Sequence, residues 1–437
     1  MKILHLSLWQ DTSRLPSFAP LERDERTDVL IIGGGMAGVL CAYFLQKAGV
    51  NYLLCEGGTI GSGTTGKTTA VLSAQHDTLY CDLIKRFGQD NAKRYLEANL
   101  DALAEFQQLC SSIDCDFEEK PSYIYSSNDA KLMRDETDAL RSLGFTAELA
   151  QKIALPVKSA AAVKFPGQAQ FHPLKFLAEI AKDLNIREHT QVKKVDNGTA
   201  FCGEHKIQAD KIIVASHFPI INTHGLFFAK LYQKRSYVIA LEGAAEYDGT
   251  FVDNRKGGMY FRNYKNLLLI GGGDHRTGKC GGNFEELRAF AKKHYPGARE
   301  KYAWATQDCM SLDGVPYIGR YSDGLPNVYV ATGFNEWGMT SSMAAAKILT
   351  AFVTGRYDPH ALAFSPSRSM LRPQLFANMG ATLLDFLSPT AKRCPHLGCA
   401  LKWNPVEHSW DCPCHGSRFA KNGKLIDNPA TGDLRLK

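Results

Sequence analysis

The sequence lacks a long hydrophobic run. No segment approaches the roughly 18 apolar residues that a membrane-spanning helix needs. The first nine residues carry too short an apolar run for a secretory signal, and Gln10 and Asp11 follow it. The formal net charge is +6, but the basic residues are scattered and form no dense patch with interleaved aromatic residues. We therefore expect no transmembrane segment and no nucleic-acid partner.

Cysteine is unevenly distributed along the 437 residues, a length that suits two or three packed domains. Dispersed thiols in apolar or helical contexts are typical of free, buried cysteines in a reducing cytosol, so we expect a cytoplasmic protein. Eight of the twelve cysteines are of this kind: Cys41, Cys55, Cys81, Cys110, Cys115, Cys202, Cys280 and Cys309. The other four stand close together in the tail, with His396 and His415 beside them.

The tail carries two matching ligand groups. The first is Cys394-Pro-His396 with Cys399 after it, and the second is Cys412-Pro-Cys414-His415. Two cysteines and two histidines also suit a tetrahedral zinc site. Zinc fingers, however, place two cysteines in one half and two histidines in the other, whereas here each half holds one of each. This arrangement differs from that of a zinc finger.

The tail resembles the Rieske [2Fe-2S] family. The resemblance implies that Cys394 and Cys412 hold one iron, and that His396 and His415 hold the other. It also implies a disulfide between the two extra cysteines, Cys399 and Cys414. Neutral imidazoles in place of two thiolates leave less negative charge on the cluster, so it accepts an electron more readily.

The second motif is G-x-G-x-x-G, at Gly33, Gly35 and Gly38. A buried-strand run over 28–32 precedes it, and a helix pattern and a second strand follow. Glu56 closes that strand about 20 residues on, where an acid hydrogen-bonds a ribose hydroxyl. The helix N-terminus, which includes Met36 and Ala37, offers free N–H groups to a pyrophosphate. The motif therefore predicts dinucleotide binding.

The loop after Glu56 is rich in small and hydroxyl residues and includes Thr68 and Thr69. It resembles the FAD enzymes of the D-amino-acid oxidase family, as does a late Gly-rich turn over 333–340. The resemblance implies an FAD contact at Val192, which offers an amide to the adenine, and at Ala215, near the pyrophosphate. It places the flavin against Gly333, Trp337, Gly338, Met339 and Thr340. We expect non-covalent FAD, with Cys309 as a packing residue.

The two resemblances predict an α/β fold. A Rossmann-like FAD-binding domain (28–80, 150–225 and 305–355) carries an inserted α+β substrate domain (81–149 and 226–304). An N-terminal arm (1–27) lies over the surface. A linker helix (356–392) leads to a minimal Rieske β subdomain (393–437), too small to fold without its cluster and docking. The linker helix is expected to pack on the flavin domain, with a membrane-surface helix as the alternative.

The predicted activity is FAD-dependent oxidation of a small amine or amino-acid-like substrate. Electrons would pass from FAD to the cluster, and then to a one-electron acceptor protein or a quinone. Arg262 is the candidate for binding a substrate carboxylate, and His275 and His76 are candidates for lining the pocket. The alternatives are an oxygen-using amine oxidase with a structural cluster and a non-catalytic redox sensor.

Overall fold

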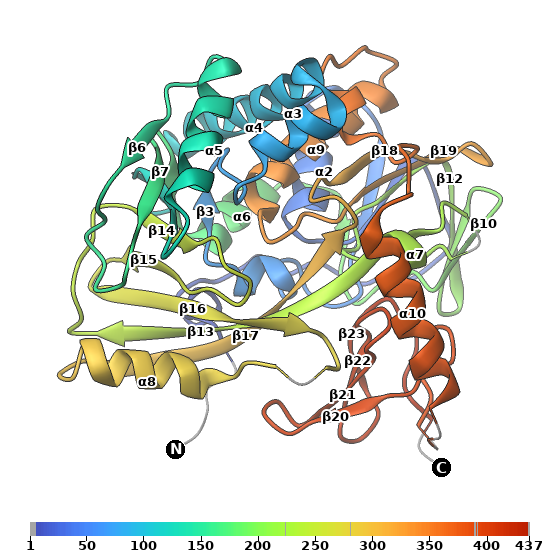
Figure 1. Cartoon of the computed structure of the whole chain (residues 1–437). Coiled ribbons are helices and arrows are strands. Elements are labelled where there is room, and N and C mark those ends of the chain that lie inside the picture. The colour runs from blue at the N-terminus through green and yellow to red at the C-terminus, as the bar shows by residue number, and fades with distance from the viewer. Residues whose placement is uncertain (1–5, 223, 280, 389, 391, 436–437) are drawn as a thin grey trace.

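The computed structural model describes residues 6–222, 224–279, 281–388, 390 and 392–435, so Cys280 lies outside the described residues. Two eight-stranded sheets stand side by side, and a four-stranded sheet formed by the tail packs below them (Figure 1). None of the described helices has the length and apolar character needed to cross a membrane.

The first sheet is the nucleotide-binding sheet. Its centre is parallel, because β1 pairs in parallel with both β2 and β12, and β12 with β19. In path order its strands are β10 (Lys194–Asp196), β11 (Thr199–Cys202), β12 (His205–Val214), β1 (Glu25–Ile32), β2 (Tyr52–Cys55) and β9 (Ile186–Arg187), with β19 (Leu325–Thr332) and β18 (Tyr317–Ser322) branching from β12. Three helices pack around it: α2 (Met36–Lys47), α6 (Pro173–Ala181) and α9 (Gly338–Val353). The parallel order brings the ends of β1, β2 and β12 to one edge.

The second sheet is the substrate-domain sheet, and most of its pairs are antiparallel. Its order is β17 (Arg299–Ser311), β13 (Leu231–Glu242), β16 (Leu267–Arg276), β15 (Tyr260–Tyr264), β14 (Thr250–Asp253), β5 (Ser122–Ser126), β7 (Ala161–Phe165) and β6 (Glu148–Ala150). Helix α8 (Phe284–His294) packs on β13 and β16. The sheet takes in β7 and the full length of β17, both beyond the ranges expected for the substrate domain.

The apolar spacing over 82–109 predicts one continuous amphipathic helix, but the structure has two helices there. They are α3 (Tyr80–Phe87) and α4 (Gln89–Cys110), and they meet at Gly88. Gly88 has a φ of 80°, a conformation that interrupts an α-helix and that glycine adopts at little steric cost. Helix α5 (Ala130–Ser142) packs on α3.

The N-terminal segment is more than a surface arm. Helix α1 (Leu8–Asp11) is capped by Ser7 and packs on η1 (Thr64–Lys67). Trp9 is fully buried and donates through Nε1 to the carbonyl of Thr68 at 2.6 Å. The segment therefore holds the loop that follows β2. The remaining short elements are β3 (Val71–Leu72), β4 (Glu118–Glu119), β8 (Ala169–Gln170), α7 (Phe227–Lys230) and η2 (Ala361–Phe364).

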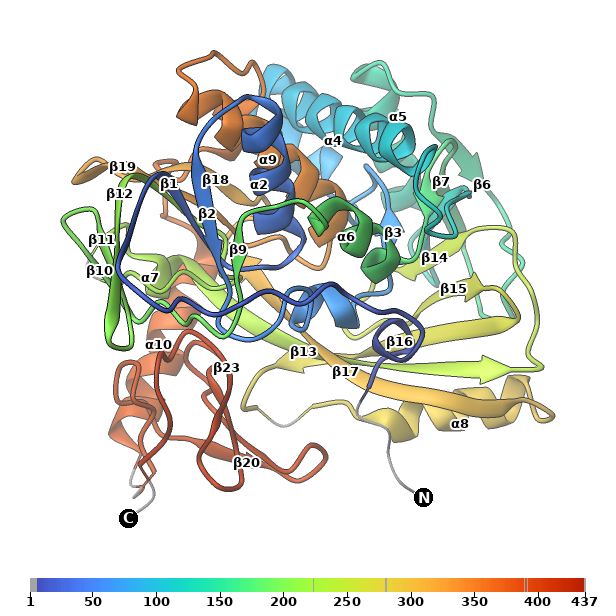
Figure 2. The same cartoon turned by 180° about the vertical axis from the view of Figure 1, so that it is seen from behind.

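The tail begins with α10 (Pro373–Leu387) and continues into β20 (Lys402–Asn404), β21 (Ser409–Asp411), β22 (Arg418–Ala420) and β23 (Leu425–Asp427). Seen from behind, this sheet lies below the nucleotide-binding sheet (Figure 2). Its apolar core is small and is formed mainly by the cluster cysteines with Leu401, Phe419, Ala430 and Leu434.

Candidate functional site

A cleft of about 620 Å³ opens at the edge where the parallel strands of the first sheet end. Ten of the residues predicted to bind the cofactor line it: Gly33, Gly35, Met36, Ala37, Glu56, Thr68, Val192, Ala215, Gly338 and Met339. They come from segments far apart in the sequence. The cleft therefore has the lining that the dinucleotide motif predicts.

Glycine is required where α2 approaches β1. A Cβ on Gly38 would lie 1.9 Å from the Gly33 carbonyl oxygen, so no side chain fits there. A Cβ on Gly33, whose φ is 112°, would lie 2.6 Å from the carbonyl oxygen of Ala215. Close packing at these glycines presents the N-terminus of α2 to the cleft.

We expect Gly38→Ala to lose affinity for FAD by at least about tenfold and to lower the free energy of unfolding by about 1–3 kcal/mol, because the backbone must move apart. Gly63→Ala is a matched control: Gly63 lines the same cleft, but a Cβ there meets nothing within 4 Å. Fluorescence titration of the apoprotein with FAD and thermal unfolding measure the two effects. Equal affinity in both variants would contradict the assigned role of Gly38.

Glu56 lies at the centre of the cleft edge. Its carboxylate accepts a 2.7 Å hydrogen bond from the amide of Gly34 and another from Gly58. Burial raises its pKa, while those amide bonds act in the opposite direction. This placement suits a carboxylate that hydrogen-bonds a ribose hydroxyl at the end of β2.

The other predicted cofactor residues do not line this cleft. Gly38 instead packs against the carbonyl of Gly33, and Gly333 lies outside the cleft lining. Thr340 is buried and donates to the carbonyl of Ser73 at 2.8 Å. Thr69 and Trp337 line a second, smaller cavity instead. Cys309, the expected packing residue, is buried in an apolar cluster.

Several cleft residues carried no sequence signal that we recognised. His189, Gln191, His217 and Phe334 are examples within the flavin domain. More unexpected is a wall formed by the tail: Lys424, Leu425, Ile426, Asp427, Asn428, Ala430, Thr431 and Asp433. The Rieske region and the dinucleotide motif therefore enclose one cleft.

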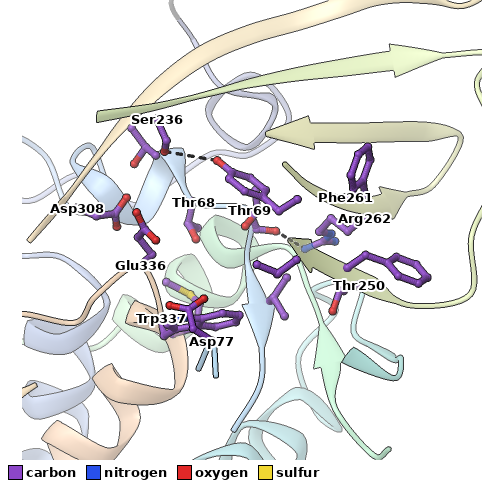
Figure 3. A pocket seen from close by; sticks show the side chains of 16 residues that line it. Thr68, Thr69, Asp77, Ser236, Thr250, Phe261, Arg262, Asp308, Glu336 and Trp337 are labelled. Atoms are coloured by element: carbon purple, nitrogen blue, oxygen red, sulfur yellow. Dashed lines mark hydrogen bonds between the residues drawn. The ribbon is translucent and has the colours of Figure 1, made fainter. Parts of the chain in front are cut away.

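The smaller cavity, of about 90 Å³, lies between the two large sheets. It meets the cleft at Thr68, Asp308, Glu336 and Met339, which line both. Figure 3 shows Arg262 on one side and Asp308 and Glu336 on the other. A cavity of this size and composition suits a small substrate with groups of both charges.

Arg262 extends from β15 and is 2% exposed. Its Nη1 donates to the carbonyls of Thr69 and Ala70, and its guanidinium lies 5.4 Å from the Trp9 ring. Its Nη2 has no hydrogen-bond partner among the described residues. Burial lowers the pKa of Arg262 to about 9, so the group remains charged at neutral pH. It offers one free donor to an anionic group in the cavity.

Four carboxyl groups gather at the other side around one cation, Lys234. The Lys234 ammonium lies 2.9 Å from Asp274 and 3.6 Å from Glu336. Asp77 and Asp308 complete the group, and burial raises the pKa of both, that of Asp308 to about 6. The pKa of Asp308, about 6, leaves its carboxylate charged at neutral pH, so this side of the cavity offers a negative group.

Glu336 is held in an unusual backbone conformation. Its φ is 73° and that of Asn335 is 51°, which non-glycine residues rarely adopt. Its side chain is 33% exposed and lines both the cleft and the smaller cavity. Burial raises its pKa to about 8, although Lys234 acts in the opposite direction.

This shift predicts a pH dependence of stability. Between the ordinary pKa of 4.5 and the folded value of about 8, the folded state keeps a proton that the unfolded state has lost. Stability contributed by the neutral carboxyl is therefore lost as pH rises through this window. We expect Glu336→Gln to raise the unfolding midpoint relative to wild type, by an amount that grows from pH 5 to pH 8. Thermal unfolding at several pH values measures it.

Glu242→Gln provides the control. Hydrogen bonds from Lys301 and Arg299 lower the pKa of this partly exposed carboxyl, so its contribution is lost as pH falls. Its variant should show no midpoint gain that grows with pH. If the unfolding midpoints of the two variants change with pH in the same way, the pKa of Glu336 is not raised.

The two candidate histidines do not line these cavities. His76 is buried, with Nδ1 2.5 Å from the Tyr95 hydroxyl and its ring stacked on Trp337 at 5.2 Å. Burial lowers its pKa to about 3. His275 bonds the carbonyl of Gly273 at 3.2 Å and stacks on Tyr237. Both rings are therefore placed for packing around the site.

The tail brings the predicted iron ligands together in pairs, with Cys394 beside Cys412 and His396 beside His415. Cys394, Cys412 and His415 are buried, and the His396 and His415 ring centroids lie 5.0 Å apart. Nδ1 of each histidine is buried without a partner in the part of the chain that the structure describes. Burial lowers the pKa of His396 to about 4 and that of His415 to about 3, which leaves both imidazoles neutral for metal binding. The donor set fits a Rieske cluster.

Cys399 and Cys414 form the predicted disulfide. Both are buried and link the two ligand loops, so they are not available as metal ligands. Ser417 receives a hydrogen bond from the amide of Ala430 at 3.0 Å, and its carbonyl accepts one from Cys412 at 2.8 Å. These contacts organise the second ligand loop.

The histidine side of the tail faces the flavin domain. Phe218 lies 6.3 Å from the His396 ring and 6.2 Å from the His415 ring, centroid to centroid. His396 Nε2 is 2.8 Å from Oδ1 of Asn222. The residue before Phe218, His217, lines the cleft. A cleft-lining residue and a residue packed against the ligand histidines are therefore direct neighbours in the chain.

Polar contacts fix the second ligand loop to the substrate-domain sheet. Gln233 donates to the carbonyl of His415 at 2.8 Å, and Gln307 donates to that of Gly416 at 2.9 Å. Arg276 donates to the carbonyls of Pro413 and Cys414. A further pair joins buried Arg235 to Glu407. These bonds orient the cluster loops on the body.

Comparison with known proteins agrees with this geometry. Residues 28–352 match the family model of FAD dependent oxidoreductases, and residues 387–436 match the Rieske [2Fe-2S] domain. A Bacillus subtilis (strain 168) protein, the Rieske 2Fe-2S iron-sulfur protein YhfW, is 33% identical, with 98% of this chain and 96% of that protein covered.

Two solved structures share the fold. Glycine oxidase from Geobacillus kaustophilus is 20% identical with a TM-score of 0.66, covering 79% of this chain and 100% of that one. L-proline dehydrogenase from P. horikoshii is 18% identical with a TM-score of 0.66, covering 79% and 98%. The chain belongs to the FAD dependent oxidoreductase family and carries a Rieske [2Fe-2S] domain at its C-terminal end.

Proposed function

We propose that this protein is a dehydrogenase that oxidises a small amino acid or amine and passes the electrons from FAD to its Rieske cluster. The observation that carries the proposal is the shared cleft. Residues of the dinucleotide motif and residues Lys424 to Asp433 of the tail line the same cavity. Such proximity favours a cluster that works with the flavin over one that acts as a distant structural element.

The cofactors supply the redox chemistry: FAD takes two electrons from a carbon–nitrogen centre, and the cluster takes one at a time. The chain's own residues bind and orient the substrate. Arg262 Nη2 is free to hydrogen-bond a substrate carboxylate at one side of the cavity. The Asp308 carboxylate attracts an ammonium group at the other side, beside the neutral Glu336 carboxyl, where the cavity opens into the cleft.

Enclosure of the cavity strengthens these interactions. Arg262 and Thr250 are buried, and Phe251 and Phe261 give the cavity apolar walls. Between these walls the guanidinium and the Asp308 carboxylate act in a lower effective dielectric than in bulk water. The two charged sides thus favour a zwitterion held in one orientation, with its amine-bearing carbon towards the cleft.

Anaerobic stopped-flow mixing with a panel of small amino acids and amines tests the proposal. A productive substrate should bleach the flavin absorbance first, and rapid freezing should then detect the EPR signal of a reduced Rieske cluster. Hydrogen peroxide formed in air in step with substrate loss, with the cluster oxidised throughout, would favour an oxidase with a structural cluster instead. Absence of flavin bleaching across the panel would count against a catalytic role.

A further inference from the structure

The linker helix α10 turns polar side chains towards the body and apolar side chains towards solvent, which is the reverse of an ordinary packed helix. The polar side chains of Asn378 and Asp385 are buried against the body, 3% and 4% exposed. Asn378 accepts a 2.8 Å bond from Arg276, and Asp385 lies 3.1 Å from the Lys279 ammonium. Leu375 is the one large apolar side chain buried among the described residues of this helix. Packing on the body is therefore mainly polar.

The opposite face is apolar and open. Its residues recur at helical spacing and are each more than half exposed: Phe376, Met379, Leu383, Leu384, Phe386 and Leu387, with 64%, 57%, 60%, 70%, 53% and 68% exposed. Leu371, just before the helix, is 74% exposed. Large exposed apolar side chains gathered on one helix face mark an interaction surface. Figure 1 shows α10 at the periphery of the molecule, beside the tail.

We propose that this face docks on the surface of an anionic phospholipid bilayer. Charge is the argument for a membrane. Between residues 359 and 406 the chain has five lysines and arginines and one acid, the buried Asp385; of the five, Arg368 is paired with buried Asp313, which leaves four cations. Arg372 stands at the N-terminal cap of α10, and Lys392 and Arg393 follow its C-terminal end. Cations at both ends of an exposed apolar helix match an anionic lipid surface.

The same charges disfavour a second copy of this chain as the occupant. A twofold interface uses the same patch on both subunits, so each helix would face its own copy. An antiparallel pair would place Arg372 of one copy beside Lys392 and Arg393 of the other. A parallel pair would place equal charges together at both ends. Either arrangement sets like charges in contact at the rim.

The length of α10 fixes the mode of binding. Fifteen residues span about 22 Å, short of the roughly 30 Å hydrocarbon core, so the helix would lie in the plane of the interface. Arg393 ties this helix to the cluster loop, since it donates to the carbonyls of Phe386 at 2.7 Å and Ser388 at 2.9 Å. Docking would therefore hold the first ligand loop close to the lipid surface, within reach of a quinone acceptor.

Flotation of the full-length holoprotein with vesicles tests the proposal without any substrate. One set contains phosphatidylcholine with phosphatidylglycerol, and the other contains phosphatidylcholine alone. We expect binding to the anionic vesicles that falls as salt rises. The combined change Phe376→Ser, Leu383→Ser and Leu387→Ser should lower the partition coefficient at least about tenfold, or about 1.4 kcal/mol. These exposed positions leave the core intact.

Three apolar residues exposed elsewhere serve as the matched control: Phe201, Tyr357 and Leu362, 40%, 80% and 62% exposed. Their triple serine variant should float like wild type. Three outcomes would overturn the proposal: no binding to anionic vesicles, equal loss in both triple variants, or a wild-type dimer in light scattering that the α10 variant alone converts to a monomer. The last outcome would assign the face to self-association.

Discussion

Replacing His415 by alanine should abolish the Rieske cluster and lower turnover with a one-electron acceptor by at least about a hundredfold per bound FAD. Loss of an iron ligand is expected to cost more than the ten- to hundredfold typical of outer-shell changes. His415 is 1% exposed and its Nδ1 is unpartnered within the described ranges, so no neighbouring side chain is poised to replace it. Acid-labile sulfide, the EPR spectrum and steady-state rates measure the effect.

Anaerobic flavin bleaching and a control variant separate loss of the cluster from loss of the flavin reaction. Bleaching of the flavin by substrate under anaerobic conditions should persist in the variant, because Arg262 and the carboxylates are unchanged. Leu397→Ala is the control: Leu397 lies in the first ligand loop but is 41% exposed, so the cluster should remain. Normal turnover in cluster-free His415→Ala would show that electrons leave the flavin by another route.

The tail also forms part of the cofactor cleft, which adds a structural consequence. Its small core includes the cluster cysteines, so loss of the cluster should loosen the wall from Lys424 to Asp433. We therefore expect His415→Ala to retain FAD less firmly than Leu397→Ala does. For this reason rates are compared per bound FAD.

Replacing Arg262 by methionine should remove the preference for a substrate that carries a carboxylate. Loss of one partner of a buried charged pair costs about 2 kcal/mol or more, which is at least about 30-fold in kcat/KM. The ratio of kcat/KM for an amino acid to that for the corresponding amine is the measurement. This ratio should fall towards one, while the rate with the amine changes less.

The ratio separates recognition from general damage. Arg262 also bonds the carbonyls of Thr69 and Ala70, so the variant loosens the cofactor loop for both substrates alike. Arg320→Met, at an exposed position on β18, should leave the ratio unchanged. An unaltered ratio in Arg262→Met would remove Arg262 from substrate recognition, although its packing role would stand.

Local motifs were the part of this protein that the sequence predicted well. Gly33, Gly35 and Gly38 serve one turn between a strand and a helix, and their spacing carries that geometry by itself. The ligand pairs of the tail were also recognisable from their spacing, because each pair lies within one short loop. The matched families confirm FAD and the Rieske cluster as the cofactors, and the structure confirms the Cys399–Cys414 pairing.

Helices were predicted less well where a single residue interrupts them, or where the surroundings decide which face is buried. A helical pattern continues through Gly88, yet its φ of 80° divides the segment into α3 and α4. The apolar spacing in α10 was interpreted as a packing face. Polar contacts of Asn378 and Asp385 with the body turn the apolar face to solvent instead. The periodicity of apolar residues does not indicate which side of a helix meets the body.

The sequence alone determined the fold family and the cofactors and predicted the iron ligands, because each is carried by residues close together in the chain. Tertiary structure alone decided what surrounds them. It gathers Asp77, Lys234, Asp274, Asp308 and Glu336 from five distant segments, and it turns the tail into a wall of the FAD cleft. Such long-range contacts depend on how sheets and loops pack against one another, and that packing leaves no periodic or spaced pattern in the sequence.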